Sequence, residues 1–133
     1  MTTHATATFT IKNWDEKPYH EIEGGGKLTR ATVTQSFAGD IEGEGVVEYL
    51  MAYRAEGTAS FVGLQRIEGR LGGRSGSFVL QLSGTYENGA AQATWSVVRG
   101  TATGDLRGLM GDGGFHAEHG PAGAATLDYD FDA

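Results

Sequence analysis

The central part of the chain alternates apolar and polar residues with a period of two. Between residues 41 and 84 three such runs follow one another, separated by the short segments 56–57 and 71–73. The runs are rich in β-branched and aromatic residues, and the glycines between them favour tight turns. The pattern therefore predicts three consecutive strands joined by two hairpin turns.

The same alternation recurs on both sides of this segment. We predict five further strands, over residues 5–12, 27–37, 91–97, 112–117 and 125–132. Asn88-Gly89 indicates a two-residue hairpin turn, because these residues adopt positive φ angles readily. The charged, glycine-ended segment 16–26 is predicted to be a loop. Residues 103–110 are predicted to form a short helical turn that Thr103 could cap.

Eight strands joined by short turns favour an antiparallel meander in which each strand pairs with its sequence neighbours. Closing such a sheet into a barrel removes its exposed edges. In the last strand Leu127, Tyr129 and Phe131 alternate with aspartates, so the apolar side chains are expected to point inward. We predict an all-β fold, an eight-stranded antiparallel up-and-down β-barrel forming a single domain over residues 1–133. A two-sheet sandwich is the alternative.

Composition limits the chemistry, the partners and the cellular location that this barrel can have. The chain has 22 glycines, 2 prolines and no cysteine, and its formal net charge is −7. Many turns are consistent with the glycine content, and the lack of cysteine rules out disulfides and thiolate metal sites. The acidic balance argues against nucleic-acid binding. We expect no membrane-spanning segment, no secretory signal and a cytoplasmic location.

The inward face of the central strands carries the candidate binding residues. Tyr49 and Tyr53 share one face of their strand, and Trp95 shares a face with two alanines that would leave room beside its ring. Such a wall suits a small, mostly apolar molecule. The alternative is that these side chains simply fill the barrel. The candidate ligand-binding residues are Tyr49, Tyr53, Phe61, Gln65, Trp95 and Tyr129.

The outward face of the same strands is partly charged and partly apolar. The residues Glu42, Glu44 and Glu48 are expected to form surface ion pairs across strands, and the candidate partners are Arg54, Arg66, Arg70 and Arg74. A buried catalytic carboxylate is the less favoured interpretation. Val46, Leu50 and Ala52 make this face apolar where solvent is expected, which predicts an oligomer contact, most simply in a homodimer.

Two other segments resemble functional motifs. His116, Glu118 and His119 are possible metal ligands, but alternation along a strand prevents the three from converging, so we predict no metal site. Residues 72–77 resemble a phosphate-binding loop without its lysine and helix, and a hairpin turn with a bulge is the better interpretation. The sequence predicts no cofactor.

Several stretches together resemble an uncharacterised bacterial family of domains of unknown function. They are residues 14–19, 27–31, 39–81 and 100–115, together with Trp95. The family is similar in fold to allene oxide cyclase, an eight-stranded barrel. The resemblance implies this architecture and a precedent for small apolar ligands in the lumen, but it implies no activity.

Two functional hypotheses follow. The first is a barrel that binds a small apolar or amphipathic molecule in its lumen, with a cyclase- or isomerase-like activity as one form of it. The alternative is a non-catalytic structural or oligomerisation module with a filled core. No activated nucleophile is evident in the sequence, so whether the chain is an enzyme stays open at this stage.

Overall fold

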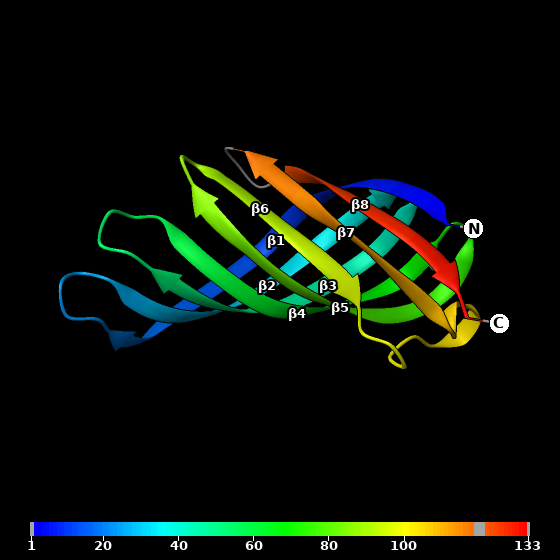
Figure 1. Cartoon of the computed structure of the whole chain (residues 1–133). Helices are drawn as coiled ribbons and strands as arrows, with labels where there is room; N and C mark the ends of the chain where they lie inside the picture. Colours follow the sequence, from blue (N-terminus) through cyan, green and yellow to red (C-terminus); the bar gives the residue numbers. More distant parts are fainter. Residues whose placement is uncertain (1, 119–121, 133) are drawn as a thin grey trace.

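The computed structural model describes residues 2–118 and 122–132, and within them the chain forms a closed barrel (Figure 1). Every strand pairs antiparallel with its sequence neighbours, and β1 closes the barrel against β8. The strands are β1 (Thr3–Glu21), β2 (Lys27–Gly39), β3 (Ile41–Tyr53), β4 (Ala59–Leu71), β5 (Arg74–Glu87), β6 (Ala90–Val97), β7 (Leu109–Glu118) and β8 (Ala122–Phe131). The predicted eight-stranded up-and-down barrel is confirmed, and the sandwich alternative is wrong.

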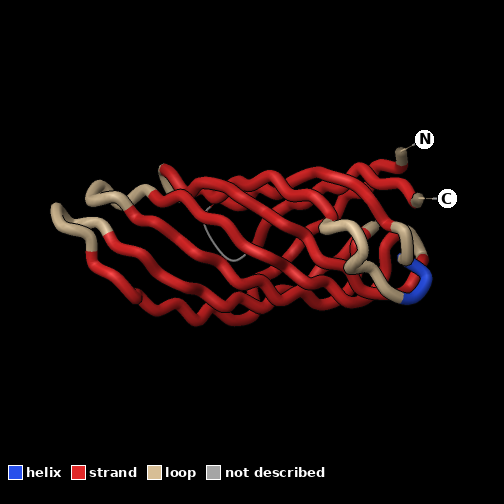
Figure 2. Tube along the Cα trace, turned by 60° about the horizontal axis from the view of Figure 1, so that its bottom comes forward, coloured by secondary structure: helices blue, strands red, loops and turns tan. Residues whose placement is uncertain are grey.

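The two ends of the barrel differ. At one end, which we call the hairpin end, lie the β1–β2, β3–β4 and β5–β6 turns, and the first two of these hairpins project farthest (Figure 1). The other end, the terminal end, carries both chain termini and the 3-10 helix η1 (Gly104–Leu106) (Figure 2). The predicted helical turn is thus confirmed but is shorter. Thr103 precedes η1 without capping it, because its hydroxyl lies 2.7 Å from that of Ser77.

The turns follow the local sequence. Asn88 and Gly89 have φ angles of 53° and 78°, and Gly72 and Gly73 have 57° and 85°. Both pairs fit two-residue hairpin turns with positive φ at each central position. The hairpin predicted for residues 72–77 is therefore confirmed, with the turn at its first two residues, but the predicted bulge is wrong, because β4 and β5 pair without a register shift.

The loop predicted for residues 16–26 is wrong for its first half, because β1 continues to Glu21. The β1–β2 register shifts between Ile11 and Asn13, as a β-bulge does, and the pairing then continues through residue 21. Beyond Thr10 the strand no longer pairs with β8 and is an edge strand, where Pro18 is tolerated. Pairing with the long β2 strand thus keeps residues 16–21 in a strand although their polar composition favours a loop.

The inward face was predicted correctly. Val47, Tyr49 and Met51 are buried, whereas Val46 and Leu50 between them are about half exposed. The β3–β4 register runs without a shift, so no bulge reverses this alternation. No helix within residues 2–118 and 122–132 is long and apolar enough to cross a membrane.

Candidate functional site

A small cavity lies inside the barrel towards the hairpin end. Its volume is about 70 Å³, and its wall is largely aromatic and aliphatic. Two of the lining side chains, Trp14 and Tyr86, are substantially exposed, so the cavity lies close to the barrel surface. It is lined by Phe9, Ile11, Trp14, Gln35, Tyr49, Met51, Phe61, Tyr86, Ala91, Phe115 and Ala117.

Tyr49 supplies a hydroxyl to this apolar wall. The residue is only 4% exposed, and its ring packs edge-on against Phe61 at 5.1 Å and beside Trp14 at 6.0 Å. Its hydroxyl makes no hydrogen bond within the described part of the chain. Burial raises the pKa of the Tyr49 phenol far above its ordinary value, so the group stays a neutral donor. Because no fully buried side-chain N or O atom of the described residues lacks a hydrogen bond, the Tyr49 oxygen keeps some contact with solvent, and a ligand acceptor can take the place of that solvent.

A pair of buried amides lies beneath the cavity. Gln65 Nε2 donates to Gln35 Oε1 over 2.5 Å, and both residues are almost fully buried. Of the two, Gln35 lines the cavity. The amide pair therefore gives the cavity one further polar boundary.

A carboxylate lies at the rim of the hairpin end. Glu16 Oε2 accepts hydrogen bonds from Thr29 Oγ1 (2.6 Å) and from the Tyr53 hydroxyl (2.7 Å). Glu16 Oε1 accepts one from Trp14 Nε1 (2.9 Å). Burial alone would raise the pKa of this carboxyl, but the three hydrogen bonds and the charge of Lys27 outweigh it and lower the pKa. Glu16 is therefore ionised at neutral pH.

Two of the predicted ligand-binding residues, Tyr49 and Phe61, line the cavity. Tyr53 lies at the rim, where it bonds Glu16. Gln65 touches the cavity through its partner Gln35 rather than directly.

The remaining two predicted residues lie away from the cavity. The Trp95 ring packs behind Phe115 at 5.6 Å, and its Nε1 donates to the Thr126 carbonyl (2.9 Å). Tyr129 packs against Phe131 at 6.0 Å and lies near Gly72, at the terminal end. The structure therefore does not bring all six predicted residues into one site.

Sequence reasoning missed Trp14 and Glu16, because both fall near or within the predicted loop. The bulge after Ile11 shifts the alternation by one residue, so that Trp14 and Glu16 point inward instead of Asn13 and Asp15. The signal is present in the sequence as a second period-two run after the shift, but only the pairing with β2 reveals that it is a strand.

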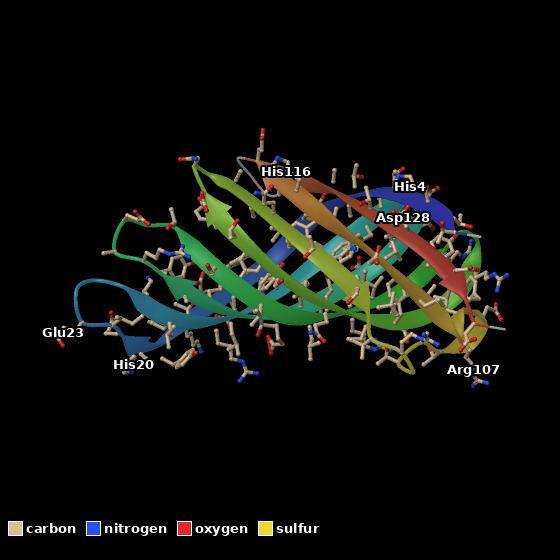
Figure 3. The ribbon with its side chains drawn as sticks, viewed as in Figure 1. His4, His20, Glu23, Arg107, His116 and Asp128 are labelled. Carbon is tan, nitrogen blue, oxygen red and sulfur yellow. The ribbon has the colours of Figure 1, made fainter. Side chains whose placement is uncertain are left out.

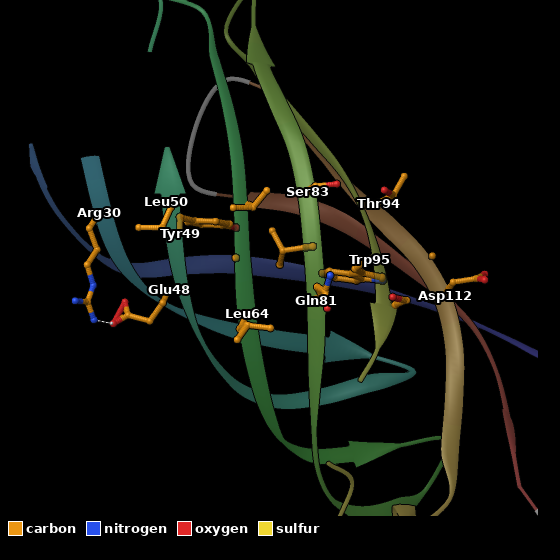
Figure 4. A pocket seen from close by; sticks show the side chains of 15 residues that line it. Arg30, Glu48, Tyr49, Leu50, Leu64, Gln81, Ser83, Thr94, Trp95 and Asp112 are labelled. Carbon is orange, nitrogen blue, oxygen red and sulfur yellow. Dashed lines mark hydrogen bonds and ion pairs between the residues drawn. The ribbon is translucent and has the colours of Figure 1, made fainter. Parts of the chain in front are cut away.

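A second, larger hollow lies on the outside of the barrel over β3 to β7 (Figure 4). We call it the outer groove, and its volume is about 1090 Å³. Leu50, Val62 and Leu64 form its apolar part, and each is about half exposed. Arg30 and Glu48 pair at one edge (3.1 Å), and Asp112 lies at the other edge.

Two of the three predicted surface glutamates form ion pairs, but not with the predicted arginines. Glu44 pairs with Lys12 (2.9 Å) and Glu48 with Arg30, which come from β1 and β2. The four predicted arginines interact differently: Arg66 with Glu68 at 3.6 Å, Arg54 with Thr58 and Ser60, Arg74 over the ring of Phe131 at 4.2 Å, and Arg70 opposite Glu42 in the β3–β4 register. The preferred partners thus lie on the preceding strands.

The histidines are dispersed. His4, His20 and His116 lie at separate places on the barrel (Figure 3), and His116 Nε2 is 3.0 Å from Glu118 on the same strand. No group of three possible metal ligands occurs among the residues that the structure describes. His119 lies outside those residues, so the absence of a metal site stays a prediction.

The fold and cavity define an eight-stranded up-and-down barrel with a small apolar cavity near one end. The chain belongs to the family described as "Protein of unknown function (DUF3224)", whose profile matches residues 5–131. It is similar to the crystal structure of a DUF3224 protein of unknown function from Shewanella oneidensis MR-1, with 29% identity, full coverage of both chains and a TM-score of 0.82. No curated protein matches the chain.

These comparisons confirm the resemblance to an uncharacterised bacterial family. The further likeness to allene oxide cyclase stays a prediction.

Proposed function

We propose that this protein binds a small, mostly apolar molecule in the cavity at the hairpin end. The observation that carries the proposal is the Tyr49 hydroxyl, which belongs to a largely buried side chain, has no hydrogen-bond partner among the described residues, and lies in a mostly apolar wall. Ligand sites typically combine such a wall with a few polar groups that orient the ligand. A ligand oxygen that accepts from Tyr49 would satisfy this donor.

The size of the cavity sets a condition on binding. About 70 Å³ accommodates roughly two water molecules, whereas a cavity of about 150 Å³ is known to hold benzene. A ring-sized ligand therefore requires Trp14 to move outward. Trp14 is 44% exposed, and its indole makes one hydrogen bond, to Glu16, so this movement disturbs little of the core.

The proposal is one of binding. A neutral phenol and an amide can orient an oxygen atom, but neither is an activated nucleophile. A cyclase- or isomerase-like reaction would have to rely on shape and on the placement of charge, with Glu16, which is hydrogen-bonded to the lining residue Trp14, as a carboxylate at the rim.

Cyclohexanone is expected to change the fluorescence of Trp14 saturably, because it is a compact apolar ring with one acceptor oxygen. Replacing Tyr49 by phenylalanine removes the donor and keeps the ring. The loss of one hydrogen bond, about 1 kcal/mol, should weaken binding about fivefold. The measurement is a fluorescence titration of the wild type and of Tyr49→Phe.

The control is Trp14→Phe, which keeps an aromatic ring at the rim and leaves only Trp95 to report. The saturable signal should largely disappear in this variant. If cyclohexanone and a panel of similar cyclic ketones, ethers and alcohols leave Trp14 unchanged, the cavity is merely a packing defect of the core.

The outer groove supports a second candidate function, as an oligomerisation module. Val46, Leu50, Val62 and Leu64 are each about half exposed and lie on the neighbouring strands β3 and β4. We infer that a second copy covers this face in a symmetric dimer, since monomers rarely expose a contiguous apolar patch of this kind. This role is compatible with a binding site inside the barrel.

Leu50→Glu is expected to convert such a dimer to a monomer, because it places a charge in the middle of the apolar face. Sedimentation velocity across the micromolar range should show the wild type as a dimer and the variant as a monomer. Thr8→Glu, exposed on β1, is a matched control that should remain dimeric. A wild type that is monomeric at high micromolar concentration would rule out the dimer.

A further inference from the structure

The rim of the hairpin end combines a carboxylate with several aromatic rings. Glu16 lies beside Trp14 and Tyr53 through direct hydrogen bonds, and the Trp14 ring lies 6.0 Å from that of Tyr49. Aromatic faces attract cations electrostatically, and tryptophan and tyrosine are the strongest of them. A carboxylate beside such rings adds a full negative charge and hydrogen-bond acceptors.

On the basis of the binding site proposed above, we propose that its ligand carries a positively charged nitrogen at the end that faces the rim. The ligand class is then a compact apolar group with an ammonium or quaternary ammonium head. The apolar part would lie in the cavity, and the head would lie between Glu16 and the rings of Trp14 and Tyr53.

Glu16 has room for one more donor. Among the described residues, its Oε2 accepts two hydrogen bonds and its Oε1 accepts one, from Trp14. Each carboxylate oxygen has two lone pairs, so Oε1 can accept an ammonium N–H both while Trp14 donates to it and after the Trp14 ring has moved outward. The two hydrogen bonds to Oε2, from Thr29 and Tyr53, fix the orientation of the carboxylate before a ligand arrives, which reduces the cost of ordering it.

Lys27 shows that this rim accepts a cation. Its Nζ lies 5.2 Å above the centre of the Tyr53 ring, and its charge acts on Glu16. Because Lys27 is an exposed side chain at the start of β2, a ligand cation can compete with it for this position. The net charge of −7 also favours cations over anions in the approach to the barrel.

The test uses three compounds of nearly equal shape: cyclohexylmethylammonium, cyclohexylmethanol and cyclohexanecarboxylate. Each is titrated into the full-length chain at neutral pH, with Trp14 fluorescence as the readout and ionic strength held constant. The ammonium compound should bind about fivefold more tightly than the alcohol, and the carboxylate should bind more weakly than both.

Two variants separate the charge effect from a structural one. Glu16→Gln keeps an acceptor oxygen and the side-chain shape, and it should weaken binding of the ammonium more than binding of the alcohol, so that the preference for the ammonium disappears. Lys27→Met removes the competing cation and should tighten binding of the ammonium about threefold. This second variant does not depend on the Glu16 hydrogen bonds, so it tests the proposal even if Glu16→Gln folds poorly.

Any one of three results would overturn the proposal. The first is that the carboxylate compound binds as tightly as the ammonium compound. The second is that the preference for the ammonium compound survives in Glu16→Gln, and the third is that Lys27→Met weakens binding of the ammonium compound. If the alcohol binds without any charge preference, only this inference fails. If none of the three compounds gives a saturable signal, the proposed binding site fails together with it.

Discussion

Trp95→Ala should lower the free energy of unfolding by about 3–5 kcal/mol, the range for removing a large buried aromatic side chain. Trp95 is 3% exposed, packs against Phe115, and donates a hydrogen bond to the Thr126 carbonyl (2.9 Å). Its removal leaves a cavity in the wall and an acceptor without its donor. Urea unfolding of both proteins measures the difference.

Two control variants show how much of this loss comes from the buried ring, from the hydrogen bond and from the position in the core. Trp95→Phe keeps a ring and loses the hydrogen bond, so most of the loss should be recovered. Trp14→Ala removes the other tryptophan, which lies half exposed at the rim, and should cost much less than Trp95→Ala. Equal losses for Trp14→Ala and Trp95→Ala would contradict the assignment of Trp95 to the core and of Trp14 to the rim.

Gly69→Ala should also destabilise the barrel strongly, by about 2–4 kcal/mol. Gly69 on β4 lies opposite Gly43 on β3, and their φ angles are +155° and +143°. A Cβ atom at Gly69 would lie 2.0 Å from the Glu42 carbonyl oxygen and 2.8 Å from Gly43 Cα. Both contacts are with backbone, so neither can be relieved by rotating a side chain.

Gly57→Ala is the matched control, because Gly57 also has a positive φ (+97°) but nothing within 4 Å of a Cβ atom. It should cost only the conformational term, about 1–2 kcal/mol. The difference between the two variants in urea unfolding isolates the steric part. Equal losses would show that β3 and β4 can accommodate a Cβ atom at Gly69.

The fold could be predicted because each local signal pointed to the same answer. Alternation defined the inward face of β3, where Val47, Tyr49 and Met51 are indeed buried, and the Asn88-Gly89 turn formed as its composition required. Short turns between consecutive strands then left little choice of pairing. Local pattern and global topology agree along most of the chain.

The site was predicted less well, because it depends on register rather than on alternation. One extra residue near Lys12 reverses which side chains of β1 point inward, and this brought Trp14 and Glu16 to the rim. A period-two pattern does not reveal such a bulge when polar residues follow it. The partners of Glu44 and Glu48 were missed for a related reason. Lys12 and Arg30 lie on β1 and β2, and their proximity to these glutamates follows from the registers of β1, β2 and β3, which the sequence does not give.

The position of Tyr129 illustrates a further limit. Its inward orientation followed from alternation in β8 and is confirmed. Its depth along the barrel axis did not follow, because that depends on the stagger of all eight strands. It therefore lies at the terminal end, away from Tyr49 and Phe61.

The central claim is that the hairpin end of the barrel binds a small apolar molecule. The most direct measurement is a ¹H–¹⁵N spectrum recorded during addition of cyclohexanone, since the two tryptophans give two indole N–H signals that Trp14→Phe assigns. Binding should move the Trp14 signal saturably as its ring leaves the cavity, while the signal of Trp95, which is hydrogen-bonded to Thr126, should stay nearly fixed. A Trp14 signal that does not move, with backbone shifts confined to the outer groove, would contradict this claim.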